Sequence, residues 1–293
     1  MQLKETYSKD VSIIGLIGLK ASFSLSPLIM NTAFQVFKMP YVYKIYNFKD
    51  INACTKLLRD KKFKGFNVTF PYKVSIINYL DKLDETALRA GAVNVVVREN
   101  DFLIGYNTDG LGYLRALLED IPNIKLVNQK VVLLGSGGAA CAIALALAEN
   151  GVKQLVIASR NLKTANNLVK NLKNYTFAKA VDLSLCKDEV LTSTLVINAT
   201  PVGIFSDAMP LPCEFLTKGQ IVSDIIYMPL LTKFLKCAFK KGAIIQNGLN
   251  MLLHQAALSF ELWFKDKKFP LKIVKEVLFT KLKEHYCKAQ ERM

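Results

Sequence analysis

The sequence predicts an α/β protein of two domains: an N-terminal α/β domain and a doubly wound, Rossmann-type domain. Three observations predict this fold class. Short apolar, β-branched segments alternate with segments of helical periodicity. A glycine-rich turn at residues 135–140 follows a buried strand and begins an apolar helix. The chain of 293 residues is also long enough for two domains, each with its own core.

In the first hundred residues, strand-like segments alternate with helices whose starts are marked by capping residues. Ser26 precedes a proline and is the expected N-cap of a helix to about Lys38, and Asp50 is the expected cap of another to about Asp60. Pro71 is expected to open a third helix, since proline suits the first helical position. The expected strands are residues 11–19, 41–48, 65–70, 92–98 and 102–106, the last two forming a hairpin. This alternation predicts a layer of mostly parallel strands.

A second unit begins near Lys130 and repeats the strand–helix pattern of a doubly wound fold. One helix is expected from the glycine-rich turn to Gly151 and another over residues 163–173. The expected strands are residues 131–134, 154–159, 176–181, 195–199 and 221–226. From Gly248 onward the chain is helical, and we expect its last helices, about 249–264 and 271–290, to return to the first domain. The predicted domains are residues 1–107 with 247–293, and residues 108–246.

The composition is that of a globular protein, with 51% hydrophobic and 22% charged residues. No stretch approaches the roughly 18 consecutive apolar residues that a membrane span needs. Residues 1–6 are mostly polar and lack the apolar centre of a signal peptide. We therefore expect a cytoplasmic protein without a membrane partner.

Cysteine, histidine and charge content exclude several classes of site. The six cysteines are scattered without a Cys-x-x-Cys pair, which argues against a disulfide framework or a metal site and favours reduced thiols. The only two histidines, His254 and His285, leave little for a histidine triad. The net charge of +15 comes from dispersed Lys and Arg without a nucleic-acid-binding signature. We expect no nucleic-acid partner, and a basic surface that attracts anionic substrates and cofactors.

The glycine-rich turn fits the dinucleotide fingerprint, with Gly135, Gly137 and Ala140 at its three small positions. The first glycine permits the tight turn, the second lets backbone N–H groups approach a pyrophosphate, and the third small residue allows close packing of helix on strand. The helix N-terminus attracts the phosphates. SAM-dependent methyltransferases and plain turns also use such a sequence. The three further strands that follow favour a dinucleotide.

The end of the next strand indicates NADP(H) as the cofactor. NAD binding usually employs an acidic residue there for the ribose 2′-hydroxyl, whereas NADP favours an arginine beside the 2′-phosphate. This chain has Ser159, Arg160 and Asn161, with Lys163 close by and no acid. The alternative for Arg160 is a solvated charge at a strand end.

Lys73 is a candidate catalytic acid or base. It ends the segment of residues 66–73, in which a polar Asn-Val-Thr strand end is followed by Phe-Pro-Tyr-Lys. If Pro71 opens a helix, Lys73 lies near the positive end of the helix dipole, where a cation is disfavoured. A lysine there would lose its proton more easily than a surface lysine, as acid/base catalysis requires. The alternative is a solvated lysine on a short helix.

Taken in order, these motifs resemble the shikimate dehydrogenase family, including its quinate/shikimate dehydrogenase branch. The resemblance covers nearly the whole chain and implies reversible reduction of 3-dehydroshikimate to shikimate by NADPH, in the biosynthesis of chorismate and aromatic amino acids. It also implies that the substrate binds the first domain and that hydride crosses a cleft between the domains, with a hinge between them. The motifs that carry the resemblance are residues 23–27, 67–73, 91–94, 105–110, the glycine-rich turn, 198–203 and 248–255.

The resemblance implies that Lys73 and Asp109 form the catalytic pair. Reduction of a ketone needs a proton donor as its oxygen gains negative charge, and an ammonium group can both stabilise and protonate that oxygen. A carboxylate in reach would orient Lys73 and bind the neighbouring hydroxyl. Asp109 also suits a helix start, because Asn107 and Thr108 precede it. The two roles are compatible.

The resemblance assigns the other site residues to substrate or cofactor. Ser24 and Ser26 would hold the substrate carboxylate near a helix N-terminus. The remaining implied substrate-binding residues are Asn67, Thr69, Asn94, Tyr227 and Gln255. The implied cofactor-binding residues are Gly135, Ser136, Gly137, Gly138, Ala139, Ser159, Arg160, Asn161, Thr200, Ile225 and Gly248. No metal is expected, and the chain is expected to be a monomer or a homodimer.

Several positions depart from the family pattern and keep an alternative open. Phe23 stands where many relatives have histidine, Met228 replaces a frequent asparagine, and Asn247 stands where aspartate often precedes Gly-Leu. Residues 232–235 look like the quinate/shikimate branch, whereas Thr69 looks like the shikimate-specific one. The alternative is thus a quinate/shikimate dehydrogenase using NAD or NADP. A regulatory paralogue without turnover is disfavoured because both members of the catalytic pair are present, and a methyltransferase would leave the Asn-Val-Thr motif unexplained.

Overall fold

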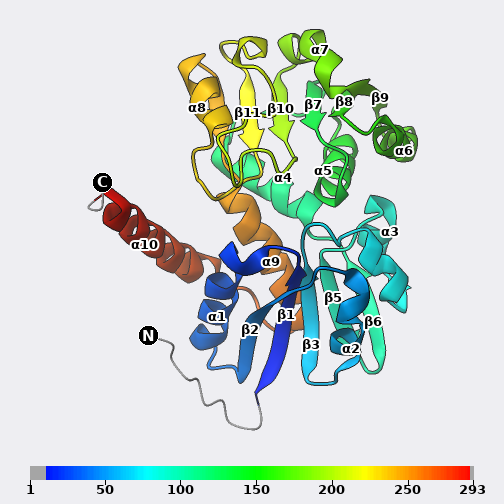
Figure 1. Cartoon of the computed structure of the whole chain (residues 1–293), viewed down its shortest axis with the longest axis vertical. Helices are drawn as coiled ribbons and strands as arrows, with labels where there is room; N and C mark the ends of the chain where they lie inside the picture. The colour runs from blue at the N-terminus through cyan, green and yellow to red at the C-terminus, as the bar shows by residue number, and fades with distance from the viewer. Residues whose placement is uncertain (1–10, 291–293) are drawn as a thin grey trace. The chain divides into compact units, whose positions relative to one another are not determined.

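The structure, a computed structural model, describes residues 11–290, and the side chains of residues 285–290 are not among what it describes. The polar residues 1–6 and the side chains of His285 and Cys287 therefore lie outside it. The chain divides into two compact units (Figure 1). Among the described residues, the first unit comprises 11–84, 93–106 and 256–290, and the second comprises 85–92 and 107–255.

The first unit contains a six-stranded sheet with the order β2-β1-β3-β5-β6-β4. β1 pairs in parallel with β2 and β3, and β4 with β6, whereas β5 is antiparallel to β3 and β6. The predicted hairpin is thus confirmed. The strands are β1 (Ser12–Gly18), β2 (Tyr41–Asn47), β3 (Phe63–Val68), β4 (Lys82–Leu83), β5 (Val95–Glu99) and β6 (Phe102–Tyr106).

Helices and aromatic rings cover this sheet. Phe34 and Phe260 are buried, and their ring centroids lie 6.1 Å apart, so a residue from near the end of the chain packs beside one from near its start. The helices of the unit are α1 (Ser26–Val36), α2 (Thr55–Arg59), α10 (Leu271–Gln290) and the second half of α9 (Leu249–Trp263), with the 3-10 turns η1 (Ala21–Phe23), η2 (Ile51–Cys54) and η3 (Ser75–Tyr79). Asp50 caps η2 as predicted, since its side chain accepts a hydrogen bond from Asn52 N.

The helix predicted to begin at Pro71 is wrong. Residues 71–74 form a turn, and η3 follows it. The carbonyl of Lys73 accepts a hydrogen bond from Val93 N at 2.7 Å, and Tyr72 N donates to Thr69 O at 3.0 Å. The first bond ties Lys73 to the segment before β5, and the second closes a local turn, so the segment does not begin a regular α-helix. Lys73 therefore lies on a turn, and the predicted effect of a helix dipole on it does not apply.

The second unit has a six-stranded, fully parallel sheet with the order β12-β11-β10-β7-β8-β9. The first strand of the unit lies at its centre, the next two extend to one side and the last three to the other, which is the order of a dinucleotide-binding fold. The doubly wound prediction is confirmed. The strands are β7 (Lys130–Leu134), β8 (Gln154–Ser159), β9 (Phe177–Asp182), β10 (Leu195–Asn198), β11 (Ile221–Asp224) and β12 (Ile244–Gln246).

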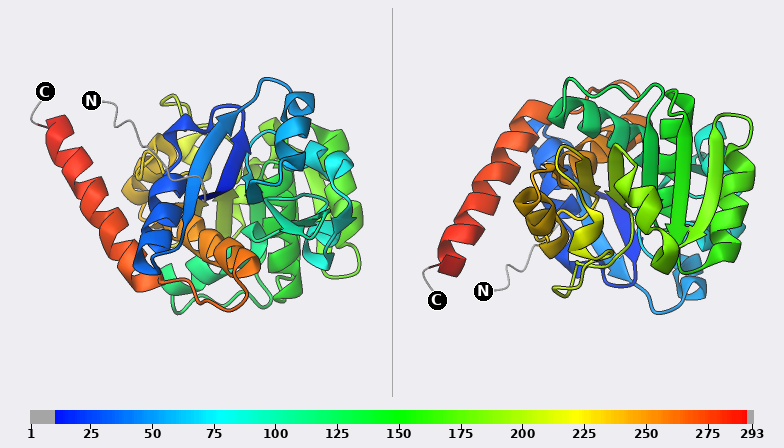
Figure 2. Two further views of the ribbon diagram at one scale, coloured as in Figure 1. Left: turned by 90° about the horizontal axis from the view of Figure 1, so that it is seen from below. Right: turned by 90° about the horizontal axis from the view of Figure 1, so that it is seen from above.

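Helices cover both faces of this sheet (Figure 2). Because successive strand side chains point to opposite faces, Val131 of β7 joins the core under α4, α5 and α6, whereas Val132 joins the core under α7 and α8. The helices of the unit are α3 (Glu85–Ala90), α4 (Asp109–Asp120), α5 (Gly138–Glu149), α6 (Leu162–Leu172), α7 (Lys187–Leu191), α8 (Lys233–Lys240) and the first half of α9, with η4 (Leu183–Leu185) and η5 (Cys213–Phe215).

The expectation that all thiols are reduced is contradicted in this unit. Cys213 of η5 and Cys237 of α8 form a disulfide with their Cα atoms 5.9 Å apart. The two residues are 24 positions apart in sequence, and tertiary packing of η5 against α8 brings them together. The spacing of the cysteines in the sequence does not predict such a contact.

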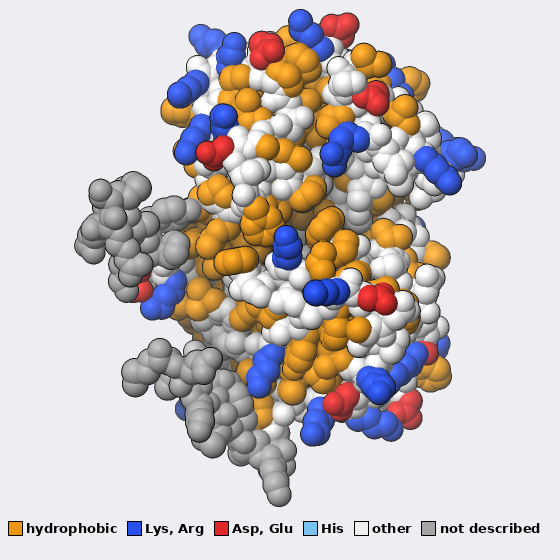
Figure 3. Space-filling view, in the orientation of Figure 1, with side chains coloured by type: hydrophobic (Ala, Val, Ile, Leu, Met, Phe, Trp, Pro, Cys, Tyr) orange, Lys and Arg blue, Asp and Glu red, His pale blue; other side chains and the backbone are white. Residues whose placement is uncertain are grey.

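The surface and the helices bear on the class of protein. On the face shown in Figure 3, Lys and Arg side chains are scattered among apolar and polar ones rather than gathered into one stripe. Within residues 11–290, no helix combines the length and the apolar character that crossing a bilayer requires.

Candidate active site

Two serine hydroxyls meet at the amino end of α1 in the first unit. The Ser24 hydroxyl donates to Ser26 Oγ at 3.0 Å and accepts from Ser26 N at 3.1 Å. Ser26 was the predicted N-cap, but the helix is capped at Leu25 without a side-chain hydrogen bond, and Ser26 is the first helical residue. Because Ser24 takes the bond from Ser26 N, the Ser26 hydroxyl is not needed as a cap. Two adjacent hydroxyls at the start of an 11-residue helix suit an anionic group.

A second group of predicted residues lies where β3 and β5 meet. Val68 N donates to Asn94 O at 2.9 Å, and Val93 N donates to Lys73 O at 2.7 Å. Asn94 is buried, whereas Thr69 and Lys73 are half-buried. The structure therefore brings the segments of Thr69, Lys73 and Asn94 together within one unit.

The turn after β1 is adjacent to Thr69. A Cβ atom on Gly18 would lie 2.5 Å from Cγ2 of Thr69, so only glycine fits at this crossing. Thr69 N also donates to Ile17 O at 2.8 Å. The backbone of β1 thus fixes the position of Thr69.

Asn67 is held by protein groups at both ends of its amide. Its Oδ1 accepts from the Tyr43 hydroxyl at 2.7 Å, and its Nδ2 donates to Asn94 O at 3.0 Å and to Ser259 Oγ at 3.1 Å. Tyr43, Asn67 and Ser259 are all buried. Sequence reasoning singled out Asn67 but not Tyr43 or Ser259, because a tyrosine in a strand and a serine in an apolar helix carry no motif.

Asp109 is the first residue of α4 in the second unit, and it is 3% exposed. The Asn107 side chain accepts from Asp109 N at 3.0 Å and so satisfies the helix start. Thr108, the N-cap residue, makes no side-chain capping bond and instead donates to Gln255 O at 3.1 Å. The carboxylate of Asp109 is therefore not required as a cap, and it lies in the α4 turn that contacts α9.

Gln255 lies on α9 where this helix packs closely on α4. A Cβ atom on Gly112 would lie 2.8 Å from Gln255 N, so α4 can approach only because this position is glycine. The side-chain Nε2 of Gln255 donates to Leu252 O at 2.8 Å. Asp109 and Gln255 are thus positioned on two adjoining helices of one unit.

The glycine-rich turn between β7 and α5 has the geometry that a pyrophosphate requires. Gly135 has φ +105°, which favours glycine, and its N–H donates to Ala158 O at 2.8 Å. Gly137 is the N-cap of α5, and a Cβ atom built there would meet nothing within 4 Å. Backbone N–H groups at an open helix N-terminus fit the diphosphate of a dinucleotide.

Hydroxyl groups tie this turn to the end of β8. Ser136 Oγ lies 2.9 Å from Ser159 Oγ and 2.6 Å from Thr164 Oγ1. Asn161 Oδ1 caps α6 by accepting from Thr164 N at 3.2 Å. The side chains of Arg160 and Lys163 are exposed beside this helix start. Two cations at a helix N-terminus suit a phosphate.

A buried polar network joins the ends of β10 and β11. Asn198 Nδ2 donates to Asp224 Oδ1 at 3.0 Å, and Thr200 Oγ1 donates to Asn198 Oδ1 at 2.6 Å. Asp224 also accepts from Thr232 Oγ1 at 2.8 Å and from Ile226 N at 3.1 Å. Burial raises the pKa of Asp224 to about 6, against the lowering effect of these hydrogen bonds. Sequence reasoning did not select Asp224, although a carboxylate ending an apolar strand was a visible signal.

Two residues predicted to line the nicotinamide touch through their backbones. A Cβ atom on Gly248 would lie 2.0 Å from Ile225 O, and Gly248 N donates to Ile226 O at 3.0 Å. The segments of Ile225 and Gly248 are therefore in direct contact. Tyr227 follows in the same loop and is half-buried.

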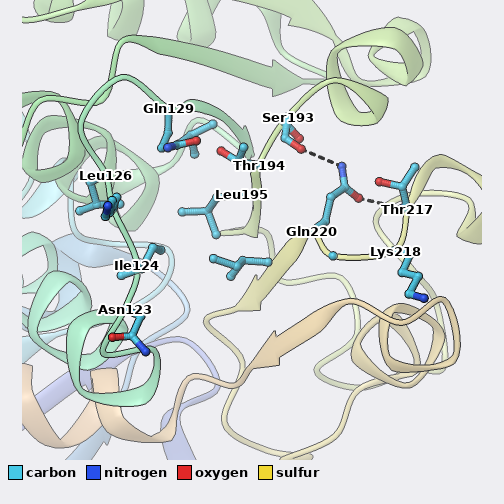
Figure 4. Close-up of a pocket in the computed structure, with 14 residues that line it drawn as sticks. Asn123, Ile124, Leu126, Gln129, Ser193, Thr194, Leu195, Thr217, Lys218 and Gln220 are labelled. Carbon is cyan, nitrogen blue, oxygen red and sulfur yellow. Dashed lines mark hydrogen bonds between the residues drawn. The ribbon is translucent and has the colours of Figure 1, made fainter.

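A separate cavity of about 500 Å³ lies in the second unit (Figure 4). Its lining includes Leu195 and Ile221, the first residues of β10 and β11, together with Gln129, Lys218 and Gln220. The glycine-rich turn and the network of Asp224 follow the opposite, carboxyl ends of these parallel strands. The cavity is therefore distinct from the predicted cofactor site. Among the described side chains, no cluster of His, Cys, Asp and Glu could hold a metal ion.

Comparison with known proteins matches three family models to this chain. They are described as the shikimate dehydrogenase substrate binding domain, over residues 16–96, the shikimate/quinate 5-dehydrogenase, over 117–203, and the shikimate 5′-dehydrogenase C-terminal domain, over 248–279. A shikimate dehydrogenase (NADP(+)) of Bacillus cereus is 40% identical over 255 residues, which are 86% of this chain and 92% of the relative.

Solved structures of similar proteins have the same fold. Shikimate 5-dehydrogenase from Listeria monocytogenes, in complex with shikimate and NAD, is 35% identical with a TM-score of 0.81 over 94% of this chain and 99% of its own. Shikimate 5-dehydrogenase from Thermus thermophilus, in complex with NADP(H) and shikimate, is 31% identical with a TM-score of 0.80 over 91% of this chain and 98% of its own.

Proposed function

The chain belongs to the shikimate dehydrogenase family, and from this membership we infer that it catalyses the reversible, NADPH-dependent reduction of 3-dehydroshikimate to shikimate. This is a step of chorismate and aromatic amino acid biosynthesis. The observation that supports it best is that hydrogen bonds hold the segments of Thr69, Lys73 and Asn94 together in the first unit. The second unit of the same chain carries a dinucleotide-binding turn, and the next strand ends without an acidic residue.

Proton transfer is assigned to Lys73. When bound, NADP(H) supplies the hydride, and the ketone oxygen then gains negative charge. The ammonium of Lys73 stabilises this charge and donates a proton to the oxygen, and in the oxidation direction its amine accepts the proton of the hydroxyl. Asp109 orients the ammonium and accepts a hydrogen bond from the adjacent hydroxyl of the ring. Its burial limits competition by water for these bonds.

Substrate binding is assigned to the polar groups of residues 1–107 and 247–293, with Tyr227 as a further contact. Ser24 and Ser26 bind the carboxylate with their adjacent hydroxyls. Thr69, Asn94 and Gln255 meet the ring hydroxyls, since an amide or hydroxyl can both donate and accept. The sequence predicts Asn67 as a member of the same group, but its amide is bonded to protein groups at both ends.

Cofactor binding is assigned to residues 108–246, with Gly248 just beyond them. The open turn of residues 135–139 receives the pyrophosphate, and Arg160 beside the start of α6 receives the 2′-phosphate. Ser159 and Asn161 shape that end of the strand through their bonds to Ser136 and Thr164. Thr200 and Ile225 border the nicotinamide. We further propose that the protein acts in the cytoplasm as a monomer or homodimer. Size-exclusion chromatography of the purified protein tests the oligomeric state, and cell fractionation tests the location.

Turnover with four substrate–cofactor pairs tests the function and separates it from the quinate/shikimate alternative. The purified protein is given shikimate or quinate with NADP or NAD, and the absorbance of the reduced nicotinamide is followed. The proposal predicts the largest kcat/KM for shikimate with NADP. Comparable turnover of quinate with NAD would assign the chain to the broader branch, and silence with all four pairs would refute the dehydrogenase assignment.

A further inference from the structure

One buried amide connects four elements of the first unit. Asn67 on β3 accepts from Tyr43 on β2 and donates to Asn94 O, just before β5, and to Ser259 on α9. Each partner comes from a different part of the chain, and the side chains are separated by 24 and 192 positions from Asn67. A contact of this kind fixes tertiary structure rather than a local turn.

The network extends to α1, the helix that begins at Ser26. Asn31 of α1 accepts from Tyr43 N at 2.8 Å and donates to Tyr43 O at 3.2 Å. Tyr43 is therefore held by its backbone as well as by its hydroxyl. Because Ser26 begins α1, the polar bonds run from the carboxylate-binding helix through Tyr43 to Asn67.

Both amide hydrogens of Asn67 are committed to the protein. One is donated to a backbone carbonyl and one to a serine hydroxyl, and the side chain is 6% exposed. To donate a hydrogen bond to a substrate, Asn67 would have to give up one of these two buried bonds. Its chemistry is that of a support for other residues.

The residue that Asn67 supports most directly is Asn94. The carbonyl of Asn94 accepts from Asn67 Nδ2 and also from Val68 N, and Asn94 N donates to Tyr106 O at 3.1 Å. The backbone of Asn94 is thus held from β3 on one side and from β6 on the other. Thr69 lies two residues after Asn67, and the amide of Asn67 ties this segment to the backbone of Asn94.

We propose that Asn67, Tyr43 and Ser259 form a positioning network that fixes Thr69 and Asn94 for recognition of the substrate hydroxyls. Asn67 is then a positioning residue. This role replaces the direct substrate contact that the sequence predicted for it. The proposal rests on the proposed function, because Thr69 and Asn94 must read a hydroxylated ring. Loosening the network weakens substrate binding and leaves cofactor binding intact.

The test compares steady-state kinetics of Tyr43→Phe and Ser259→Ala with a matched control, Tyr46→Phe. Tyr46 lies on the same strand, and its hydroxyl makes no hydrogen bond among residues 11–290. We expect Tyr43→Phe and Ser259→Ala each to raise the KM for shikimate by about tenfold, with the KM for NADP unchanged. The loss of shikimate-binding free energy in the double variant should be smaller than the sum of the losses in the two single variants, because both substitutions act through the amide of Asn67. Tyr46→Phe should match the wild type.

Each outcome decides between distinct accounts. A shikimate KM that stays at the wild-type value in both folded variants overturns the positioning network, and so does an equal rise in the KM for NADP, which would indicate general damage. If Tyr43→Phe does not fold, Ser259→Ala alone carries the test. Loss of shikimate binding in Asn67→Asp alone, with the other two silent, would restore Asn67 as a direct contact. A wild-type protein that does not turn over shikimate refutes the proposed function instead, so the two failures are distinguishable.

Discussion

At the scale of single residues, Asp224 is the most informative carboxylate outside the proposed catalytic pair. It is 1% exposed and accepts hydrogen bonds from Asn198, Thr232 and Ile226 N. These bonds fix the loops after β10 and β11, which carry Thr200 and Ile225. Burial nevertheless raises its pKa from 3.8 to about 6, so its ionised form is disfavoured in the folded protein.

The sign of the resulting pH dependence follows from this shift. A raised pKa contributes stability that is fully present below the unfolded value of 3.8 and is lost as pH rises through about 6. The side chain in Asp224→Asn cannot ionise, so this variant does not lose stability in this way as pH rises. Relative to the wild type, the variant should therefore gain up to about 3 kcal/mol of unfolding free energy between pH 4 and pH 7. Urea unfolding of both proteins across that range measures the difference, and parallel pH profiles would contradict the assignment.

The residues of the candidate site differ in how visible they were from sequence. Lys73, Asp109 and the serine pair lie in short motifs whose order is specific, so sequence reasoning could select them. Tyr43 and Ser259 could not be selected, because their importance comes from bonds to Asn67 across 24 and 192 positions. Assigning Ser26 as a helix cap was wrong for a local reason: Ser24 already accepts from Ser26 N.

At the scale of elements, the glycine-rich turn and the α9 start contrast two uses of glycine. A Cβ atom at Gly137 would meet no atom within 4 Å, whereas a Cβ atom at Gly248 would clash with the carbonyl oxygen of Ile225. We expect Gly137→Ala to weaken NADPH binding by about tenfold with little change in melting temperature, because the added methyl obstructs only the pyrophosphate. Gly248→Ala should destabilise the protein by about 1–3 kcal/mol or more, since backbone must move. Thermal unfolding and NADPH titration of both variants test this, and equal melting temperatures would contradict it.

The end of β8 and the start of α6 provide the second prediction at this scale. Arg160 is exposed there beside the N-terminus of a helix capped by Asn161. Arg160→Ala should raise the KM for NADP by at least about tenfold and leave the KM for NAD almost unchanged, because only NADP carries the 2′-phosphate. Kinetics with both cofactors measure the ratio. An equal effect on NAD and NADP would make Arg160 a general surface charge.

Prediction of the elements succeeded where periodicity and capping agreed. Five of the six parallel strands of the second unit, β7 to β11, begin and end within two residues of their predicted bounds, because apolar runs bounded by turns define buried strands. The short elements α3, α7, β4 and β12 were not predicted, since two to six residues give no periodic signal, and the eight-residue α8 was also missed. The helix at Pro71 was wrongly predicted because Val93 N donates to Lys73 O and holds that segment in a turn. A tertiary contact of this kind is invisible to local propensity.

At the scale of the whole molecule, the net charge of +15 favours anionic ligands over a long range. Such attraction is screened by salt, with a Debye length of about 10 Å at 0.1 M. We expect the KM for NADP to rise as ionic strength increases from about 0.02 M to about 0.3 M, with a steeper slope than for NAD and an unchanged kcat. Initial rates at four or more salt concentrations, about evenly spaced, measure the slopes. Equal slopes for the two cofactors would contradict a contribution of the net charge to the preference for NADP.

The central claim for the whole molecule is that a chain with this two-unit fold oxidises and forms shikimate through Lys73. Its most direct test is NADP reduction with shikimate by the wild type, by Lys73→Ala and by Lys64→Ala, a matched lysine on β3 outside the site. Removal of the proton carrier should lower kcat by about 10²–10⁴-fold while NADPH binding persists, and Lys64→Ala should retain wild-type activity. Wild-type rates in Lys73→Ala, or no shikimate turnover by the wild type, would contradict the account.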